Sequence, residues 1–183
     1  MSRFPFFASF MLTLALGACQ PGSPVATGPE LLPSPPAAPA GTTFVRQDFG
    51  KLGTAELPAG GGWQTPQPGT WENAETGLVL VLQTEPDGHG SDIKGYLDEY
   101  DKANVRDAPG WQRGPEIVGQ LHGLPAARTS GSFDNGTAWV TRDYVFFGPR
   151  ETVLLQARVP TPNAAALATV DYVAASVKPV RAK

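Results

Sequence analysis

Residues 124–160 constrain the fold most, because they are predicted to form three consecutive antiparallel strands. Residues 124–133 and 137–147 flank Asp134-Asn135-Gly136, in which Asn and Gly tolerate the positive φ angles of a tight hairpin. Gly148-Pro149-Arg150 turns the chain again before residues 152–159. There, alternation predicts one face with Val153, Leu155, Ala157 and Val159 and an opposite face with Leu154, Gln156 and Arg158. The sequence therefore predicts a half-buried antiparallel meander.

Further strands are predicted on the N-terminal side of this meander. Residues 44–57 contain two short strand candidates separated near Gly50, and residues 71–73 form another. Residues 78–82 are a continuous apolar run, which is typical of a central strand buried on both faces. Residues 117–121 form the strand that precedes the meander.

Two helices are predicted from apolar residues at helical spacing. Ser91 is the expected N-cap of the first helix, which reaches about Asn104 and carries Ile93, Tyr96, Leu97 and Tyr100 on one face. In the second helix Thr161 caps, Pro162 takes the first helical position, and Pro179 stops the helix. Its apolar stripe comprises Leu167, Val170, Val173, Ala174 and Val177. The fold class is therefore α+β, an antiparallel sheet with helices packed on it.

The N-terminal segment has the pattern of an export signal, with Arg3 followed by an apolar run that is too short to span a membrane comfortably. Its end, Leu16-Gly17-Ala18-Cys19, resembles the bacterial lipobox, in which a signal peptidase cuts before a cysteine that carries a diacylglyceryl group. The alternative is a simple secretory signal with Cys19 incidental, although Leu16 does not fit the small residues that such sites prefer. We expect a lipoprotein signal peptide at residues 1–18.

A proline-rich segment follows the predicted lipidation site. Residues 20–42 carry seven prolines among Ala, Gly and Ser, with few large apolar side chains beyond Leu31-Leu32. Proline favours extended conformers, so residues 19–42 are predicted to be a lipidated, disordered tether. A proline-rich ligand for a peptide-binding module is the alternative. The remaining residues, 43–181, are predicted to form one domain.

Composition and motifs argue against several classes of function. The formal net charge is −3 and there is no basic run, so nucleic acid is not an expected partner. The single cysteine, Cys19, cannot form an intramolecular disulfide. The sequence lacks the common hydrolase, phosphate-binding, dinucleotide and metalloprotease motifs, so we expect neither an enzyme nor a cofactor. A hydrolase would need His122 beside Ser130 or Ser132.

The order of elements resembles the PsbP-like fold, which is shared by an extrinsic subunit of photosystem II, bacterial envelope lipoproteins and a Ran-binding nuclear import factor. The residues that carry the resemblance are Leu57-Pro58, Gly62-Trp63, Tyr96-Leu97, Gly123-Leu124-Pro125-Ala126, residues 144–148 and Ala175-Ser176-Val177-Lys178-Pro179. The resemblance implies an α/β/α sandwich that members use chiefly to dock onto other proteins. Because Gly60-Gly61-Gly62 and the lack of clear metal ligands depart from the pattern, a photosynthetic role is not carried over.

Two groups of residues are candidate binding sites. Asp87, His89 and Asp92 lie in a glycine-rich loop before the first helix and are candidate ligands of a divalent cation, although they fit no established metal motif. Turn formation and helix-start charge are the simpler explanation of both aspartates. The second group, Arg128, Ser130, Gln156 and Arg158, is predicted to share one polar sheet face and to bind a partner protein.

Together these features predict a non-catalytic docking or assembly module. We expect an envelope lipoprotein that is anchored on the extracytoplasmic side of a membrane, facing the periplasm or the cell surface, and that contacts an unidentified envelope protein. The alternative is a carrier of a small apolar ligand or lipid. It is based on the aromatic side chains Trp63, Trp71, Trp111, Tyr144 and Phe147, which in most proteins simply fill the core.

Overall fold

The computed structural model describes residues 28–86 and 92–180, so Cys19 and the predicted signal peptide lie outside the described residues. The strands are β1 (Thr43–Phe49), β2 (Gly53–Gly60), β3 (Trp63–Gln67), β4 (Thr70–Asn73), β5 (Leu78–Glu85), β6 (Gln112–Arg113), β7 (Ile117–Leu121), β8 (Leu124–Asp134), β9 (Ala138–Phe147), β10 (Thr152–Pro160) and β11 (Lys178–Pro179). The helices are α1 (Ile93–Asp107), the 3₁₀ helix η2 (Thr161–Leu167) and α2 (Ala168–Ala175).

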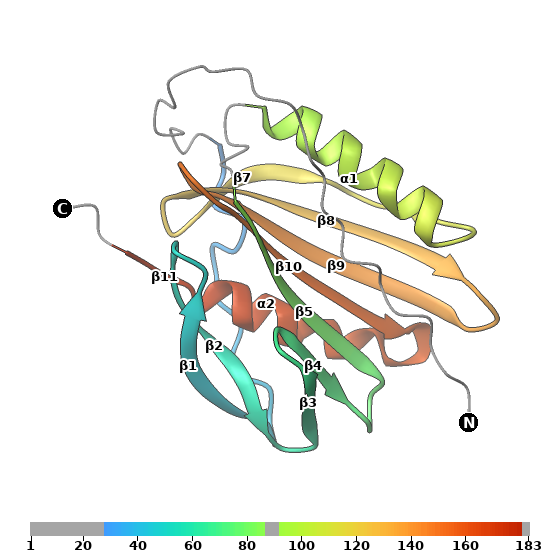
Figure 1. The fold of residues 1–183 in the computed structure, drawn as a ribbon. Helices are drawn as coiled ribbons and strands as arrows, with labels where there is room; N and C mark the ends of the chain where they lie inside the picture. The colour runs from blue at the N-terminus through green and yellow to red at the C-terminus, as the bar shows by residue number, and fades with distance from the viewer. Residues whose placement is uncertain (1–27, 87–91, 181–183) are drawn as a thin grey trace.

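Two antiparallel sheets are formed by these strands. Among the described residues the larger sheet has eight strands in the order β3-β4-β5-β10-β9-β8-β6, with β7 also paired to β8. The smaller sheet has the order β1-β2-β11. Figure 1 shows the large sheet lying between α1 and α2. The α+β class, an antiparallel sheet with helices packed on it, is confirmed.

The predicted meander is the centre of the large sheet. Strand β9 pairs with β8 on one side and with β10 on the other, and Asp134 lies opposite Ala138 across the hairpin. Gly136 adopts φ 98°, and its N–H donates to Oδ1 of Asp134 at 2.8 Å. The turn therefore uses the positive φ that the sequence predicts for this position.

Side chains of the meander are buried on both faces of the sheet. In β9, Tyr144 and Phe146 join the core on the α2 side, whereas Val145 and Phe147 join a second cluster on the α1 side. Val153, Leu155, Ala157 and Val159 also lie in the α2-side core, as predicted. The other face of β10 is not simply polar, because Leu154 packs in the α1-side cluster.

Helix α1 confirms the first predicted helix but differs at its start. The side chain of Asp92, rather than that of Ser91, caps it, because Oδ1 of Asp92 accepts from the N–H of Gly95 at 2.9 Å. Ser91 lies outside the described residues. Leu97 is buried, and the ring of Tyr96 meets that of Phe147 edge-on, with centroids 5.6 Å apart.

Strand β5 is buried on only one face, which corrects the prediction of burial on both. Leu78 and Leu80 are buried in the α2-side core, but Val79 and Val81 are only half-buried. Helix α1 packs over Ala127, Val145, Phe147 and Leu154, which belong to β8, β9 and β10. It reaches β5 only at the end of that strand, where the hydroxyl of Tyr96 donates to Glu85 at 3.2 Å.

The C-terminal helix carries the predicted apolar stripe, since Leu167, Val170, Val173, Ala174 and Val177 are all buried. Its first turns differ from the prediction. Residues 161–167 form the 3₁₀ helix η2, and no side chain caps it. The hydroxyl of Thr161 instead donates to the carbonyl of Ala138 at 3.0 Å, which ties this segment to the start of β9.

Residues 28–42, called the strap below, contact the domain although the sequence assigns them to the tether. The N–H of Leu31 donates to the carbonyl of Gln120, and the N–H of Gln120 donates to the carbonyl of Pro29, both at 2.9 Å. Leu31 joins the α2-side core. Figure 1 shows the strap, in blue, passing behind α2 from the end near β7 to the start of β1. The contacts of the domain therefore begin before residue 43.

Truncating the core at Leu155 should destabilise the protein strongly. Leu155 is fully buried between β5 and β9, so Leu155→Ala should lower the free energy of unfolding by about 2–5 kcal/mol. The matched control Val45→Ala, at a side chain that is 47% exposed, should change it by less than about 0.5 kcal/mol. Urea unfolding followed by circular dichroism would measure both, and similar losses in the two variants would contradict this packing.

Candidate functional site

A hollow lined by described residues lies where the small sheet meets the end of α2. Its volume is about 740 Å³. We call it the Tyr172 groove, and its lining residues come from the strap, β1, β2, the turn before β8, α2 and β11: Pro35, Pro36, Arg46, Glu56, His122, Tyr172, Ala175, Ser176, Val177, Lys178 and Pro179. Segments far apart in the sequence therefore form one surface.

A network of charged and polar side chains runs along this groove. The guanidinium of Arg46 bonds to Oε1 of Glu56 at 2.8 Å and donates to the carbonyl of Ser176 at 3.1 Å. The hydroxyl of Tyr172 donates to Oε2 of Glu56, and Oγ of Ser176 accepts from the N–H of Glu56 at 2.8 Å. The network joins β1 and β2 to the last turn of α2. The side chains of Arg46 and Glu56 remain about one-third exposed.

Hydrogen bonds shift the ionisation of this pair. The hydrogen bond from Tyr172, followed by the hydrogen bond and charge of Arg46, holds the pKa of Glu56 below its usual value of 4.5, although burial opposes this. The same contact raises the pKa of the Tyr172 hydroxyl, because the neighbouring carboxylate disfavours a phenolate. Glu56 is therefore held in its charged form at neutral pH.

His122 lies at the edge of the groove and was predicted only as a possible base for a hydrolase. It adopts φ 54°, a left-handed conformation that few non-glycine residues take, in the turn between β7 and β8. Its Nε2 is 2.8 Å from the carbonyl of Ala175, and its N–H donates to Glu30 at 3.2 Å. The hydroxyl of Ser130 instead donates to the carbonyl of Pro115. These bonds connect His122 to α2 and the strap.

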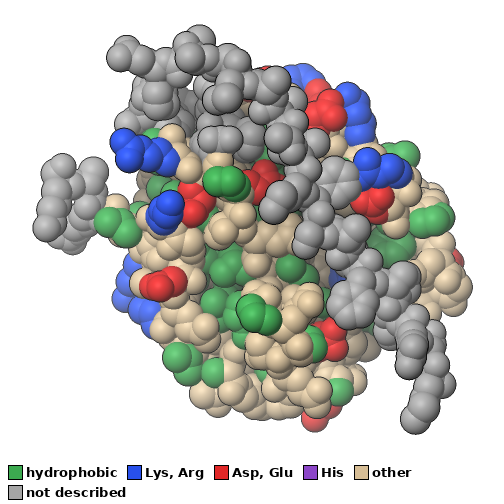
Figure 2. Space-filling view, viewed as in Figure 1, with side chains coloured by type: hydrophobic (Ala, Val, Ile, Leu, Met, Phe, Trp, Pro, Cys, Tyr) green, Lys and Arg blue, Asp and Glu red, His purple; other side chains and the backbone are tan. Residues whose placement is uncertain are grey.

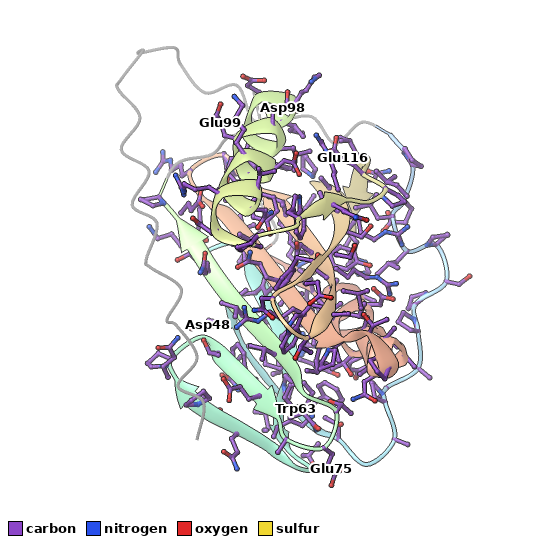
Figure 3. The ribbon with its side chains drawn as sticks, turned by 90° about the vertical axis from the view of Figure 1, so that its right-hand side faces the viewer. Asp48, Trp63, Glu75, Asp98, Glu99 and Glu116 are labelled. Carbon is purple, nitrogen blue, oxygen red and sulfur yellow. The ribbon has the colours of Figure 1, made fainter. Side chains whose placement is uncertain are left out.

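A second hollow, the β1–β5 cleft, separates the small sheet from the edge of the large one. Its volume is about 510 Å³, and Asp48, labelled in Figure 3, is one of its lining residues. Leu57, Trp71 and Leu82 are among its apolar lining residues. Of the five aromatic residues on which the carrier prediction was based, Trp71 lines the cleft, whereas Tyr144 and Phe147 are buried in the two cores. Figure 2 shows hydrophobic side chains near the middle of the face drawn there and charged ones mainly at its margins.

The structure does not bring the four predicted partner-binding residues onto one face. Arg128 pairs in register with Tyr144, and Tyr144 with Leu155, so Arg128 and Ser130 lie on the α2 side of the sheet. Gln156 and Arg158 alternate with Leu155 and lie on the α1 side. The prediction of a shared face is therefore wrong, because it assumed the relative register of β8 and β10.

Gln156 takes part in a buried hydrogen-bonded group beneath α1. Its side-chain amide donates to the hydroxyl of Tyr100 at 2.7 Å, and that hydroxyl donates to Oδ2 of Asp143 at 2.8 Å. The N–H of Ala157 donates to the other oxygen of Asp143 at 3.2 Å. Burial raises the pKa of Asp143 to about 7, although these two donors oppose the shift. Arg158 lies 5.8 Å over the ring of Trp139.

The remaining predicted sites fall partly outside the described residues. Asp87, His89 and Cys19 are not described, and the carboxylate of Asp92 caps α1. Within residues 28–86 and 92–180, no group of three or more His, Cys, Asp or Glu side chains is arranged to hold a metal ion. The same ranges contain no helix that is both long and apolar enough to cross a bilayer.

Solved structures share this fold at low sequence identity. The solution structure of cyanobacterial PsbP from Synechocystis superimposes with a TM-score of 0.57 at 12% identity and covers 81% of this chain and 99% of that chain. A protein of unknown function from Pseudomonas aeruginosa gives a TM-score of 0.50 at 12% identity over 77% of this chain and 99% of that chain. The chain therefore has the PsbP-like fold that the sequence resembles.

LpqN of Mycobacterium tuberculosis, a protein involved in cell envelope biogenesis, also superimposes, with a TM-score of 0.44 at 15% identity over 75% of this chain and 76% of that chain. At that score the likeness carries no argument about this chain. No protein-family model and no curated protein sequence matches it.

Removing the Tyr172 hydroxyl should change the ionisation of Glu56. Tyr172→Phe deletes the donor that contributes most to stabilising the carboxylate, so the pKa of Glu56 should rise toward 4.5. An NMR titration of the side-chain carboxyl carbon would measure it. Tyr96→Phe, which removes a hydroxyl bonded to Glu85, is the control and should leave Glu56 unchanged. An equal shift in both variants would contradict the direct contact.

The stability of the protein should depend on pH through Asp143. Because folding raises the pKa of this carboxyl from 3.8 to about 7, the folded state binds a proton that the unfolded state loses between these values. Stability should therefore decrease as the pH rises through this window, by up to about 1.4 kcal/mol per pH unit. Asp143→Asn should remove that decrease in urea unfolding series. The difference between parent and variant separates Asp143 from Glu56, whose lowered pKa acts in the opposite direction.

Proposed function

We propose that this chain is an envelope lipoprotein, anchored by an acylated Cys19, whose PsbP-like domain docks onto another envelope protein without catalysing a reaction. The lipobox-like Leu16-Gly17-Ala18-Cys19 supports the anchor. The Tyr172 groove supports the docking role and is the observation on which it mainly depends.

The groove has the chemistry of a surface that recognises a polar partner. Arg46 and Glu56 present opposite charges that remain partly exposed, and the exposed Lys178 adds a second cation near Glu56. Electrostatic complementarity of this kind contributes specificity and association rate more than raw affinity. The expected partner presents a carboxylate toward Lys178 and Arg46.

The groove is also ordered before any partner arrives. Hydrogen bonds from three segments fix Arg46, Glu56 and Tyr172, and the rings of Phe44 and Tyr172 lie 4.6 Å apart. Association loses less side-chain entropy when the contacting groups are already held in place. The ordered polar groups of this groove can therefore support binding without a large apolar interface.

Acylation is tested independently of docking. Cells that express the full chain and are grown with radiolabelled palmitate should incorporate the label into the protein. Cys19→Ala should abolish this incorporation, because the thioether can no longer form. Membrane fractionation of the same cells should show the parent with the membranes and the variant released. Equal incorporation and localisation of both forms would refute the anchor.

Docking at the groove is tested by site-specific crosslinking in native membranes. A photo-reactive residue in place of the exposed Pro35 should form an adduct with the partner, and Lys178→Glu in the same chain should reduce that adduct several-fold. The matched control is Lys102→Glu on α1, where Lys102 pairs with Glu99 away from the groove. The melting temperature should stay unchanged in both. An adduct that is insensitive to Lys178→Glu but lost in Lys102→Glu would refute docking at this groove.

The second candidate function is a carrier, and the β1–β5 cleft favours it. Its volume of about 510 Å³ lies within the range of small-molecule sites, and Leu57, Trp71 and Leu82 provide apolar walls. Native mass spectrometry of the mature Cys19→Ser chain would reveal a copurifying apolar ligand. Ala59→Trp, at an exposed residue that lines the cleft, should displace it without disturbing the core. Identical empty spectra for parent and variant would eliminate the carrier.

A further inference from the structure

We infer that the β7 edge of the domain, defined by Ile117 and Val118, faces and contacts the lipid bilayer. This inference depends on the proposed acylation of Cys19. It follows from where the strap is fixed to the domain, how much chain remains between that point and Cys19, and which side chains are exposed beside it.

The strap is attached to β7 at its first residues, Pro29 to Leu31. Pro29 and Leu31 exchange two backbone hydrogen bonds with Gln120, and the carboxylate of Glu30 accepts from the N–H of His122. Leu31 is only 7% exposed and packs in the core. Detaching this segment would expose an apolar side chain and break several hydrogen bonds, so the strap belongs to the folded unit.

Gly119 is what allows the strap to approach β7 so closely. A Cβ atom at residue 119 would lie 2.2 Å from the carbonyl oxygen of Pro29, which no side chain tolerates. Gly28 also lies close to β7, since a Cβ there would be 3.0 Å from Cα of Gly119. The position of the strap therefore depends on Gly119, where a Cβ would also lie 3.2 Å from Cδ2 of the core residue Leu31.

The chain between Cys19 and the strap is short compared with the diameter of the domain. Nine residues lead from Cys19 to Gly28, and even a fully extended chain of that length spans at most about 32 Å. A domain of this size has a radius of gyration of about 15 Å and is therefore about 40 Å across. If none of residues 19–42 contacted the domain, this tether would span up to about 80 Å and the domain could turn in any direction. Fixing the strap removes that freedom.

The side chains beside the point of attachment suit a bilayer surface. Ile117 and Val118 are 37% and 41% exposed, and they point to opposite sides of the edge strand. Arg113 forms an ion pair with Glu116, which Figure 3 labels and which directly precedes β7, and it also lies within 4 Å of carboxylate oxygens of Asp98 and Asp101 on α1. Arg128 lies in register with Ile117 and places a half-buried cation on the α2 side of this edge, where its side chain also interacts with Tyr144. Apolar side chains with a cation beside them favour shallow insertion.

The test uses the full acylated chain in vesicles of phosphatidylethanolamine and phosphatidylglycerol that carry a lipid-bound fluorescence quencher. Cys19 is the only cysteine, and acylation blocks its sulfur, so Val118→Cys introduces one reactive thiol for a fluorophore. The matched control is Val45→Cys on β1, which is similarly exposed. Figure 1 shows β1 in the small sheet and β7 beside β8 at the margin of the large sheet, so the two strands belong to different sheets. We expect quenching at residue 118 to exceed that at residue 45 several-fold.

Two further variants connect this result to the strap. Gly119→Ala, combined with Val118→Cys, should displace the strap, lengthen the tether and reduce quenching to the level of the control. Insertion of a second copy of residues 20–27 should do the same without any change in the domain, which covers the case in which Gly119→Ala fails to fold.

The outcomes separate this inference from the proposed anchor. Equal quenching at residues 118 and 45 in a protein that incorporates palmitate would overturn the membrane-facing edge while leaving the anchor intact. Strong quenching at residue 118 that persists after the insertion would overturn the role of the short tether. Failure to incorporate palmitate would overturn both the anchor and this inference.

Discussion

Burial of the meander on both faces is the constraint on which the rest of the structure depends. Strand β9 presents Tyr144 and Phe146 to one side and Val145 and Phe147 to the other, and all four side chains are fully buried. A sheet with two apolar faces must be covered twice. Helix α2 and the small sheet cover one face, and α1 covers part of the other. The part that α1 leaves uncovered explains why Val79 and Val81 of β5 are only half-buried.

The same constraint places the polar features of the molecule. Because α2 lies against the large sheet, its C-terminal turn meets β1 and β2, and Arg46, Glu56 and Tyr172 join them in the Tyr172 groove. Because α1 lies over β9 and β10, Asp143 is removed from water and depends on Tyr100 and the backbone of Ala157 for hydrogen bonds. The groove remains accessible and charged, whereas Asp143 is isolated and has a raised pKa. The pKa values of Glu56 and Asp143 therefore shift in opposite directions, because the hydrogen bond from Tyr172 dominates at Glu56 and burial dominates at Asp143.

The strap connects this architecture to the proposed role at a membrane. A domain on a long, flexible tether can turn any of its surfaces away from the bilayer. A domain that is attached through the strap at β7 can turn only part of its surface away from the bilayer. The Tyr172 groove is lined in part by Pro35 and Pro36 of the strap, so the segment that sets the orientation also forms one wall of the proposed docking surface. The proposed orientation and the proposed docking surface thus both depend on the position of the strap.

The sequence alone determined the main elements, since the Asn135-Gly136 turn, the alternation of β10 and the stripe of α2 are local patterns of backbone and side-chain preference. It also determined the fold class, and the residues that carry the PsbP-like resemblance led to the right architecture. Only the tertiary structure decided which polar residues meet. Arg128 and Gln156 looked equivalent in alternation, but the register across β8, β9 and β10 places them on opposite faces. The Tyr172 groove and the attachment of Leu31 were equally out of reach, because their contacts join segments up to 130 residues apart and no local pattern encodes a long-range pairing.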